Sequence, residues 1–107
     1  PFPDAVRENT ILQARVPELN DGLRANVVDF VQKLREMDLK KPPAVSETID
    51  WARTVVLLNM DVLDSDFVKN TLNVLLKFKS DIEAAESDLP RLMRESLHPK
   101  ESGTAAE

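Results

Sequence analysis

The sequence contains no cysteine, two glycines and one histidine among its 107 residues. Without cysteine it can form no disulfide, no thiolate metal site and no cysteine nucleophile, which is typical of a reducing compartment. A phosphate-binding loop needs glycines before a Gly-Lys-Ser/Thr triplet, and neither Gly22 nor Gly103 precedes one. The only histidine is His98, so a catalytic triad lacks its base and a histidine-rich metal site lacks its ligands. We therefore expect no enzymatic activity from this chain alone, and no metal or cofactor bound by it.

Long apolar runs and basic clusters are also missing. No stretch approaches the roughly 20 apolar residues of a membrane span, and the N-terminus has no basic-then-apolar signal region. The net charge is −5 with a pI of about 4.9, and acidic and basic residues are interspersed. The densest basic spot is the pair Lys40-Lys41, whereas a nucleic-acid binder needs a basic face. We predict a cytoplasmic protein that binds neither nucleic acid nor membrane.

Two pairs of carboxylates have the spacing of one helical turn. Glu83 and Glu86 form one pair, and Glu47 and Asp50 form the other. Such spacing is common on solvated helix faces, and no histidine accompanies either pair to complete a Glu-x-x-His site. A solvated face or a helix cap is therefore the favoured interpretation.

The residues that are present indicate one all-α domain. Hydrophobic residues make up 42% of the chain and charged residues 31%, close to globular averages. The periodicity predicts a small bundle of four to five helices over residues 1–97. The small polar residues of segment 98–107 predict a disordered tail.

Helix starts and stops follow from capping residues and prolines. Asp4, Asn20 with Asp21, Ser46 and Asp64 are the expected N-caps of four helices, and a fifth is expected from Ser80 or Asp81. Pro17 and Pro42-Pro43 end the first two helices. Pro90 should kink the last helix, or restart it with Asp88 as a new cap.

The same pattern predicts which side chains are buried. The first helix has Val6, Ile11 and Leu12 as its apolar anchors, and Phe2 is placed to staple its start. The third helix is apolar nearly all round, which places it in the middle of a bundle. Its apolar residues are Ile49, Trp51, Ala52, Val55, Val56, Leu57 and Leu58. The apolar stripes of the second, fourth and fifth helices comprise Leu23, Val27, Phe30, Val31, Leu34 and Met37; Phe67, Val68, Leu72, Leu75, Leu76 and Phe78; and Ile82, Ala85, Leu89, Leu92, Met93 and Leu97. The opposite, solvated face of the second helix comprises Asp29, Gln32, Lys33, Arg35 and Glu36.

One segment resembles a known family. Residues 41–53 read Lys-Pro-Pro-Ala-Val-Ser-Glu-Thr-Ile-Asp-Trp-Ala-Arg and are similar to the signature of the C-terminal lid in one branch of MoxR-type AAA+ ATPases. The flanks agree. Residues 1–4 with the charged helix after them resemble the entry into the lid, residues 35–41 the helix end before the signature, and residues 63–77 the closing helix. The likeness covers about residues 3–82.

The resemblance implies a function for a larger protein. It implies an AAA+ lid-like fold cut from a parent whose ATPase core lies upstream, in keeping with a start at Pro1 rather than Met. That parent would bind ATP and Mg²⁺, assemble with neighbouring subunits into a ring, and work with a von Willebrand factor A domain protein. Such pairs act in chaperone-like remodelling or metal-centre maturation. The lid would close over the nucleotide and couple ATP binding and hydrolysis to movement.

The resemblance also directs attention to Arg53. AAA+ lids commonly contribute a sensor-2 arginine, because a guanidinium stays charged and donates to phosphate oxygens in a fixed geometry. In many relatives this arginine lies near the start of the helix, at a register that here falls on Thr48 or, in a related register, on Ser46. Arg53, about a turn further on, is the candidate cofactor-binding residue. The alternative is a surface salt bridge from Arg53 to Asp50 or Glu47.

Three other residues have two interpretations. Trp51 either packs against adenine or a neighbouring subunit, or is the largest part of the core, and its apolar helix favours the core. Lys40 and Lys41 either face acidic groups on a neighbouring subunit or are solvated loop charges.

Two other classes of function compete with the lid. A free-standing helical protein–protein interaction module would expose an apolar groove and have no link to nucleotide. A structural oligomerisation bundle would show a melting temperature that depends on concentration.

Overall fold

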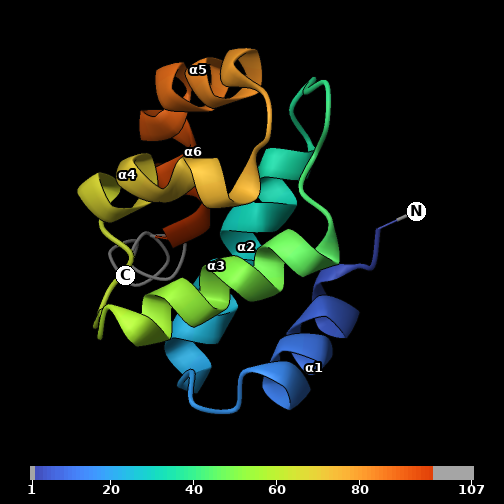
Figure 1. Cartoon of the computed structure of the whole chain (residues 1–107), viewed down its shortest axis with the longest axis vertical. Coiled ribbons are helices and arrows are strands. Elements are labelled where there is room, and N and C mark those ends of the chain that lie inside the picture. The colour runs from blue at the N-terminus through green and yellow to red at the C-terminus, as the bar shows by residue number, and fades with distance from the viewer. Residues whose placement is uncertain (1, 98–107) are drawn as a thin grey trace, which may run out of the picture.

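The computed structural model describes residues 2–97, which form six α-helices and, within that range, no strand (Figure 1). The helices are α1 (Ala5–Arg15), α2 (Asp21–Arg35), α3 (Val45–Leu57), α4 (Ser65–Leu75), α5 (Lys79–Ser87) and α6 (Leu89–Leu97). This confirms the all-α bundle, although the helix count is one above the upper end of the prediction. The expected disordered tail, residues 98–107, lies outside the described residues.

Helix α2 is the centre of the bundle, because it packs against α1, α3 and α6. Helix α3 crosses in front of it, α1 lies at one end, and α4, α5 and α6 gather at the other (Figure 1). Helix α5 packs on α4 and α6. No helix in the described range has the length and apolar content to cross a bilayer.

Three of the predicted caps are confirmed. The side chains of Asp4, Asn20 and Asp64 accept from the backbone amides three residues further on, at 2.9, 2.8 and 2.8 Å. Each bond satisfies an amide that has no partner within its helix. The first, second and fourth helices therefore begin where the sequence predicted.

The predicted cap of α3 is wrong. Ser46 is the second residue of the helix and is exposed, and Ala44 holds the N-cap position. The side chain of Glu47 accepts from the Ala44 amide at 2.8 Å. This bond is half of a capping box, and it satisfies an amide of the first turn without a polar cap residue.

The last helical region begins earlier than expected and is divided. Helix α5 begins at Lys79, after an N-cap at Phe78, and ends at Ser87. Pro90 lies in the first turn of α6, where its missing N–H removes no helical hydrogen bond, so the chain restarts rather than kinks. The carboxylate of Asp88 accepts from the Arg91 guanidinium, and this pairing lowers the pKa of Asp88.

Several apolar side chains expected inside lie at the surface. Val6 is 79% exposed, Leu57 82% and Leu58 54%, and Phe78 is also exposed. Helix α3 is thus buried along its first three turns but not at its C-terminal end. The apolar residues all round this helix predicted more burial than the structure shows, because α1, α2 and α4 cover only part of its length.

A buried ion pair joins the first three helices. Glu8 is fully buried, and its carboxylate accepts from Arg35 through both Nη1 and Nη2, at 2.7 and 2.8 Å. Gln32 donates to the same carboxylate at 2.8 Å. Arg35 also donates to the carbonyl of Pro43 and to the hydroxyl of Thr48. The prediction that Gln32 and Arg35 lie on a solvated face is therefore wrong.

The same arginine holds the first residues of the chain. The Phe2 ring lies 4.6 Å from the Arg35 guanidinium carbon, and the carbonyl of Pro3 accepts from Gln32. Phe2 therefore packs on a charged side chain, where the sequence predicted a hydrophobic staple.

Arg35→Ala should lower the free energy of unfolding by about 3–5 kcal/mol, because it leaves the Glu8 carboxylate buried without its partner. Arg7→Ala, at an exposed position of α1, is the control and should change stability by less than about 0.5 kcal/mol. Urea denaturation followed by circular dichroism measures both. Equal midpoints for the two variants would contradict a structural role for the pair.

Candidate functional site

The segment that carries the family resemblance, residues 41–53, is held firmly in place. Pro43 is buried, and its carbonyl accepts from Arg35 Nε at 2.9 Å. Just before it, the amides of Lys40 and Lys41 donate to the carboxylate of Asp81 at 2.9 and 3.0 Å. Asp81 is itself buried. Two side chains from distant parts of the chain thus fix the approach to α3.

The two lysines have different environments. Both are exposed, but the Nζ of Lys40 lies 5.8 Å from the centre of the Phe78 ring. The backbone amides of both lysines are hydrogen-bonded within the fold, and both side chains lie at the surface. A role opposite acidic groups of another subunit stays a prediction.

Trp51 is the centre of the core. Its side chain is fully buried between Phe30 and Phe67, with ring centroids 5.4 and 6.1 Å away. Its indole Nε1–H donates to the hydroxyl of Thr71 at 2.8 Å, and that hydroxyl donates in turn to the carbonyl of Phe67. The core interpretation is confirmed, because no face of the ring is available for adenine.

Arg53 lies on the exposed side of α3. Among the described residues it forms no ion pair and no side-chain hydrogen bond. The expected alternative, a bridge to Asp50 or Glu47, is not formed within that range. Glu47 instead accepts from the Ala44 amide and lies 4.0 Å from the Nζ of Lys77.

The other two registers considered for a sensor arginine are also located. Thr48 is fully buried against Arg35, and Ser46 is exposed. Thr48 and Arg53 are five residues apart on one helix, so their side chains point about 140° apart. Arg53 therefore cannot occupy the direction of Thr48.

Arg53 borders a groove between the α1–α2 connection and the C-terminal end of α3. The groove consists of two hollows of about 340 and 170 Å³ that share Glu18 and Val56. Arg15 and Arg53 line the first hollow, and Asp61 lines the second. We call it the α3 groove. Arg15 could not be singled out from the sequence, because its position is brought beside α3 only by the turn at residues 16–20.

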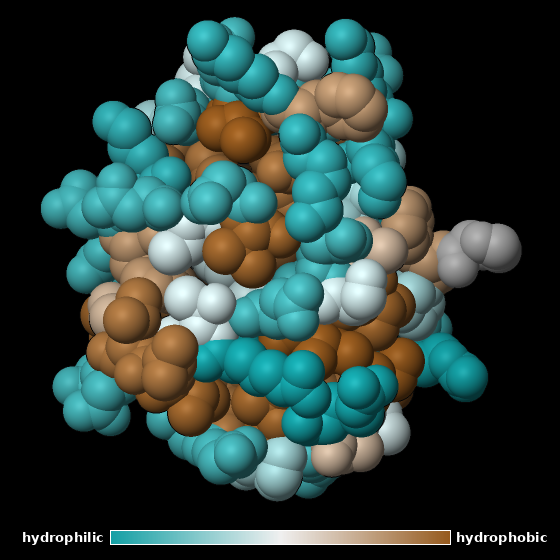
Figure 2. Space-filling view, viewed as in Figure 1, coloured by the Kyte–Doolittle hydropathy of each residue, from teal (hydrophilic) through white to brown (hydrophobic). Residues whose placement is uncertain are grey.

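An apolar patch adjoins this groove. Leu57 lines it, and Leu58 and Val62, which are 54% and 60% exposed, follow along the chain. Figure 2 shows the patch over the C-terminal end of α3. Asn59, with a φ of 55°, follows the C-cap of α3 at Leu58, and the helix does not continue to Val62. The side chains of Leu57, Leu58 and Val62 are all more than half exposed, so together they form an apolar patch at the surface.

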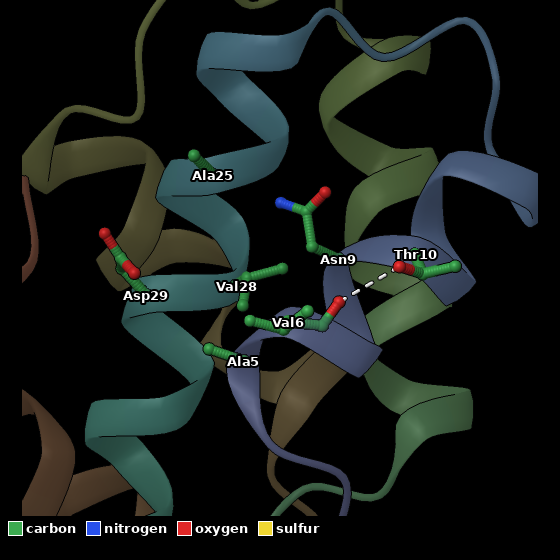
Figure 3. A pocket seen from close by; sticks show the side chains of 7 residues that line it. All are labelled: Ala5, Val6, Asn9, Thr10, Ala25, Val28 and Asp29. Atoms are coloured by element: carbon green, nitrogen blue, oxygen red, sulfur yellow. Dashed lines mark hydrogen bonds between the residues drawn. The ribbon is translucent and has the colours of Figure 1, made fainter.

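A second hollow region of about 340 Å³ lies between α1 and α2 (Figure 3). Val6 and Val28 are turned toward each other there, and Asp29 lies at its edge. Asn9 accepts from Arg24, and Thr10 donates to the Val6 carbonyl. Partial burial raises the pKa of Asp29, and the positive charge of Lys33 lowers it by less. The remaining polar group is one partly desolvated carboxylate, which provides no catalytic pair.

The candidate carboxylate pairs are solvated or structural. Glu83, Glu86 and Asp50 are exposed, and Glu47 caps α3. Within residues 2–97 no three acidic or histidine side chains gather where they could hold a metal ion. His98 lies outside the described residues.

We compared the chain with protein families, with curated proteins and with solved structures. No family model, no curated protein and no solved structure matches the chain.

Thr71→Val should lower the free energy of unfolding by about 1–3 kcal/mol, because it leaves the buried Trp51 N–H without an acceptor. Thr54→Val is the matched control, since the Thr54 hydroxyl also donates to a carbonyl four residues earlier but accepts from no other side chain. Thermal and urea unfolding measure both. A larger loss in Thr54→Val would contradict the role given to the Trp51 bond.

Asp29→Asn should raise the free energy of unfolding at pH 7. The folded-state pKa of Asp29 is above its ordinary 3.8, so folding costs free energy wherever the unfolded carboxylate is ionised. The gain should disappear below about pH 3.8, where both states bind the proton. Urea unfolding of both proteins between pH 3 and 7 measures this. A gain that persists at pH 3 would exclude the ionisation of Asp29 as its cause.

Proposed function

We propose that the chain is the C-terminal helical lid of a MoxR-type AAA+ ATPase. In this proposal it closes over the nucleotide site of an upstream ATPase core and has no turnover of its own. The parent supplies the ATP and Mg²⁺ site and the ring of subunits. Its partner is a von Willebrand factor A domain protein, and its activity is chaperone-like remodelling or metal-centre maturation. The resemblance of residues 41–53 is the source of this assignment.

The observation that carries the proposal is the rigid link from residues 2–3 to the start of α3. A lid must move as one body when the polypeptide that joins it to the core moves. Phe2 and Pro3 contact Arg35 and Gln32, and Arg35 also holds the Pro43 carbonyl and the Glu8 carboxylate. A displacement of residues 2–3 would therefore be transmitted to residues 41–53 through the guanidinium of Arg35.

The contact between Arg53 and the ATP phosphates stays a prediction. In its favour, the guanidinium is exposed and has no partner among the described residues. Against it, Arg53 points about 140° away from the register where many relatives carry this arginine. The lid proposal rests on the resemblance of residues 41–53 and on the link to the entry segment, and not on this contact.

The alternative is a free-standing helical protein–protein interaction module with no link to nucleotide. The α3 groove and its exposed apolar patch favour this alternative, because an interaction module needs such a surface. A lid needs one as well, against the core or a neighbouring subunit. The surface alone therefore does not separate the two functions.

The coding sequence around this chain separates them. We expect Gly-x-x-x-x-Gly-Lys-Ser/Thr after a predicted strand, followed by an acidic Walker-B strand, within about 200 codons upstream of Pro1. An in-frame start codon near Pro1 with neither motif before it would reject the lid and leave the interaction module.

In the full-length protein, Arg53→Ala tests the phosphate contact separately. If Arg53 donates to a phosphate, ATP turnover should fall about 10- to 100-fold, the loss expected for a hydrogen bond between charged groups. Arg94→Ala, at an exposed position of α6, is the matched control. Circular dichroism and ring assembly should be unchanged in both variants. Unchanged turnover in Arg53→Ala would exclude Arg53 as the sensor and leave the lid assignment standing.

A further inference from the structure

On the α3 side of the α3 groove, the charge of the lining residues changes from positive to negative along the chain. Arg53 and Leu57 are one turn apart at the C-terminal end of α3, and Asp61 lies in the connection that follows the helix. In chain order these three residues form a row that lines the groove. One end of this row is basic, the middle is a leucine that is 82% exposed, and the other end is acidic. Such a row is complementary to itself when it is turned end for end.

The opposite wall strengthens the basic end. Arg15 lines the same hollow as Arg53, so two guanidinium groups border it. Neither arginine forms an ion pair or a side-chain hydrogen bond within the described range. Glu18 is the one acidic residue on this wall, where the two hollows meet. The guanidinium groups of Arg15 and Arg53 could therefore bind at least one carboxylate in addition to that of Glu18.

We propose that the α3 groove binds a second copy of this chain, with the two α3 ends antiparallel about a two-fold axis. In this arrangement Arg53 and Arg15 of each copy face Asp61 of the other, and Leu57 packs on Leu57 near the axis. A two-fold interface uses the same surface on both subunits, so it requires a self-complementary row of this kind. The inference does not depend on the lid proposal.

The apolar patch explains why the contact would form in water. Leu57, Leu58 and Val62 are more than half exposed in the single chain, and the paired copy would cover them. The charges at the two ends would fix direction, because a parallel arrangement would place Arg53 against Arg53. The patch is small compared with the roughly 800 Å² per partner of a standard interface. The dimer is therefore weak and exchanges with monomer.

Sedimentation velocity of the chain between 10 μM and 1 mM, at low and moderate salt, tests the proposal. We expect a concentration-dependent shift from monomer to dimer that salt weakens, since exposed ion pairs are screened. Arg53→Asp alone and Asp61→Arg alone should each weaken association at least about tenfold, because each places like charges together.

The double variant Arg53→Asp with Asp61→Arg decides the geometry. It reverses the two pairs between positions 53 and 61, so it should associate at least about threefold more tightly than either single variant, because each new aspartate faces the new arginine of the other copy. The unchanged Arg15 opposes full recovery. Arg94→Asp, at an exposed position of α6, is the control and should leave association unchanged. A chain that stays monomeric at 1 mM, or a double variant as weak as the single ones, would overturn the proposal.

Discussion

The buried pair between Glu8 and Arg35 is the interaction on which the other contacts of the N-terminal half depend. An ion pair out of water loses hydration that its mutual attraction must offset, so it persists only where further hydrogen bonds satisfy its remaining donors and acceptors. Here Gln32 satisfies the carboxylate, and the Pro43 carbonyl and the Thr48 hydroxyl satisfy the guanidinium. The pair therefore orients α1, α2 and the start of α3 at once, with a directionality that apolar packing lacks.

Most of the fold could be predicted from local chemistry. Asp4, Asn20 and Asp64 cap helices because a short polar side chain can reach an unpaired amide three residues away, and this reasoning needs no tertiary information. The apolar stripe of α2 was also predicted correctly, since its period of 3.6 reports one buried face. The predictions failed where burial depends on a distant partner. Arg35 was assigned to solvent because the sequence does not show that Glu8, 27 residues earlier, lies against it.

The candidate site shows the same division. The core role of Trp51 could be predicted from the apolar pattern of its helix, and the structure confirms it with a buried ring and a bonded indole. The surroundings of Arg53 could not be predicted. Arg15, which lines the same hollow, is 38 positions earlier in the sequence, and the turn at residues 16–20 brings it there. The exposure of Leu57 and Leu58 was hidden for a similar reason, because hydropathy does not report where neighbouring helices end.

The carboxylate of Asp81 has a consequence for the order in which the chain folds. It bonds the amides of Lys40 and Lys41 across about 40 residues of sequence, so closing that loop costs entropy that no local contact recovers. These two hydrogen bonds of the α2–α3 connection can form only after α5 has docked. During synthesis, the two amides would therefore be without this acceptor until the ribosome had released α5, while α1 and α2 already had their caps.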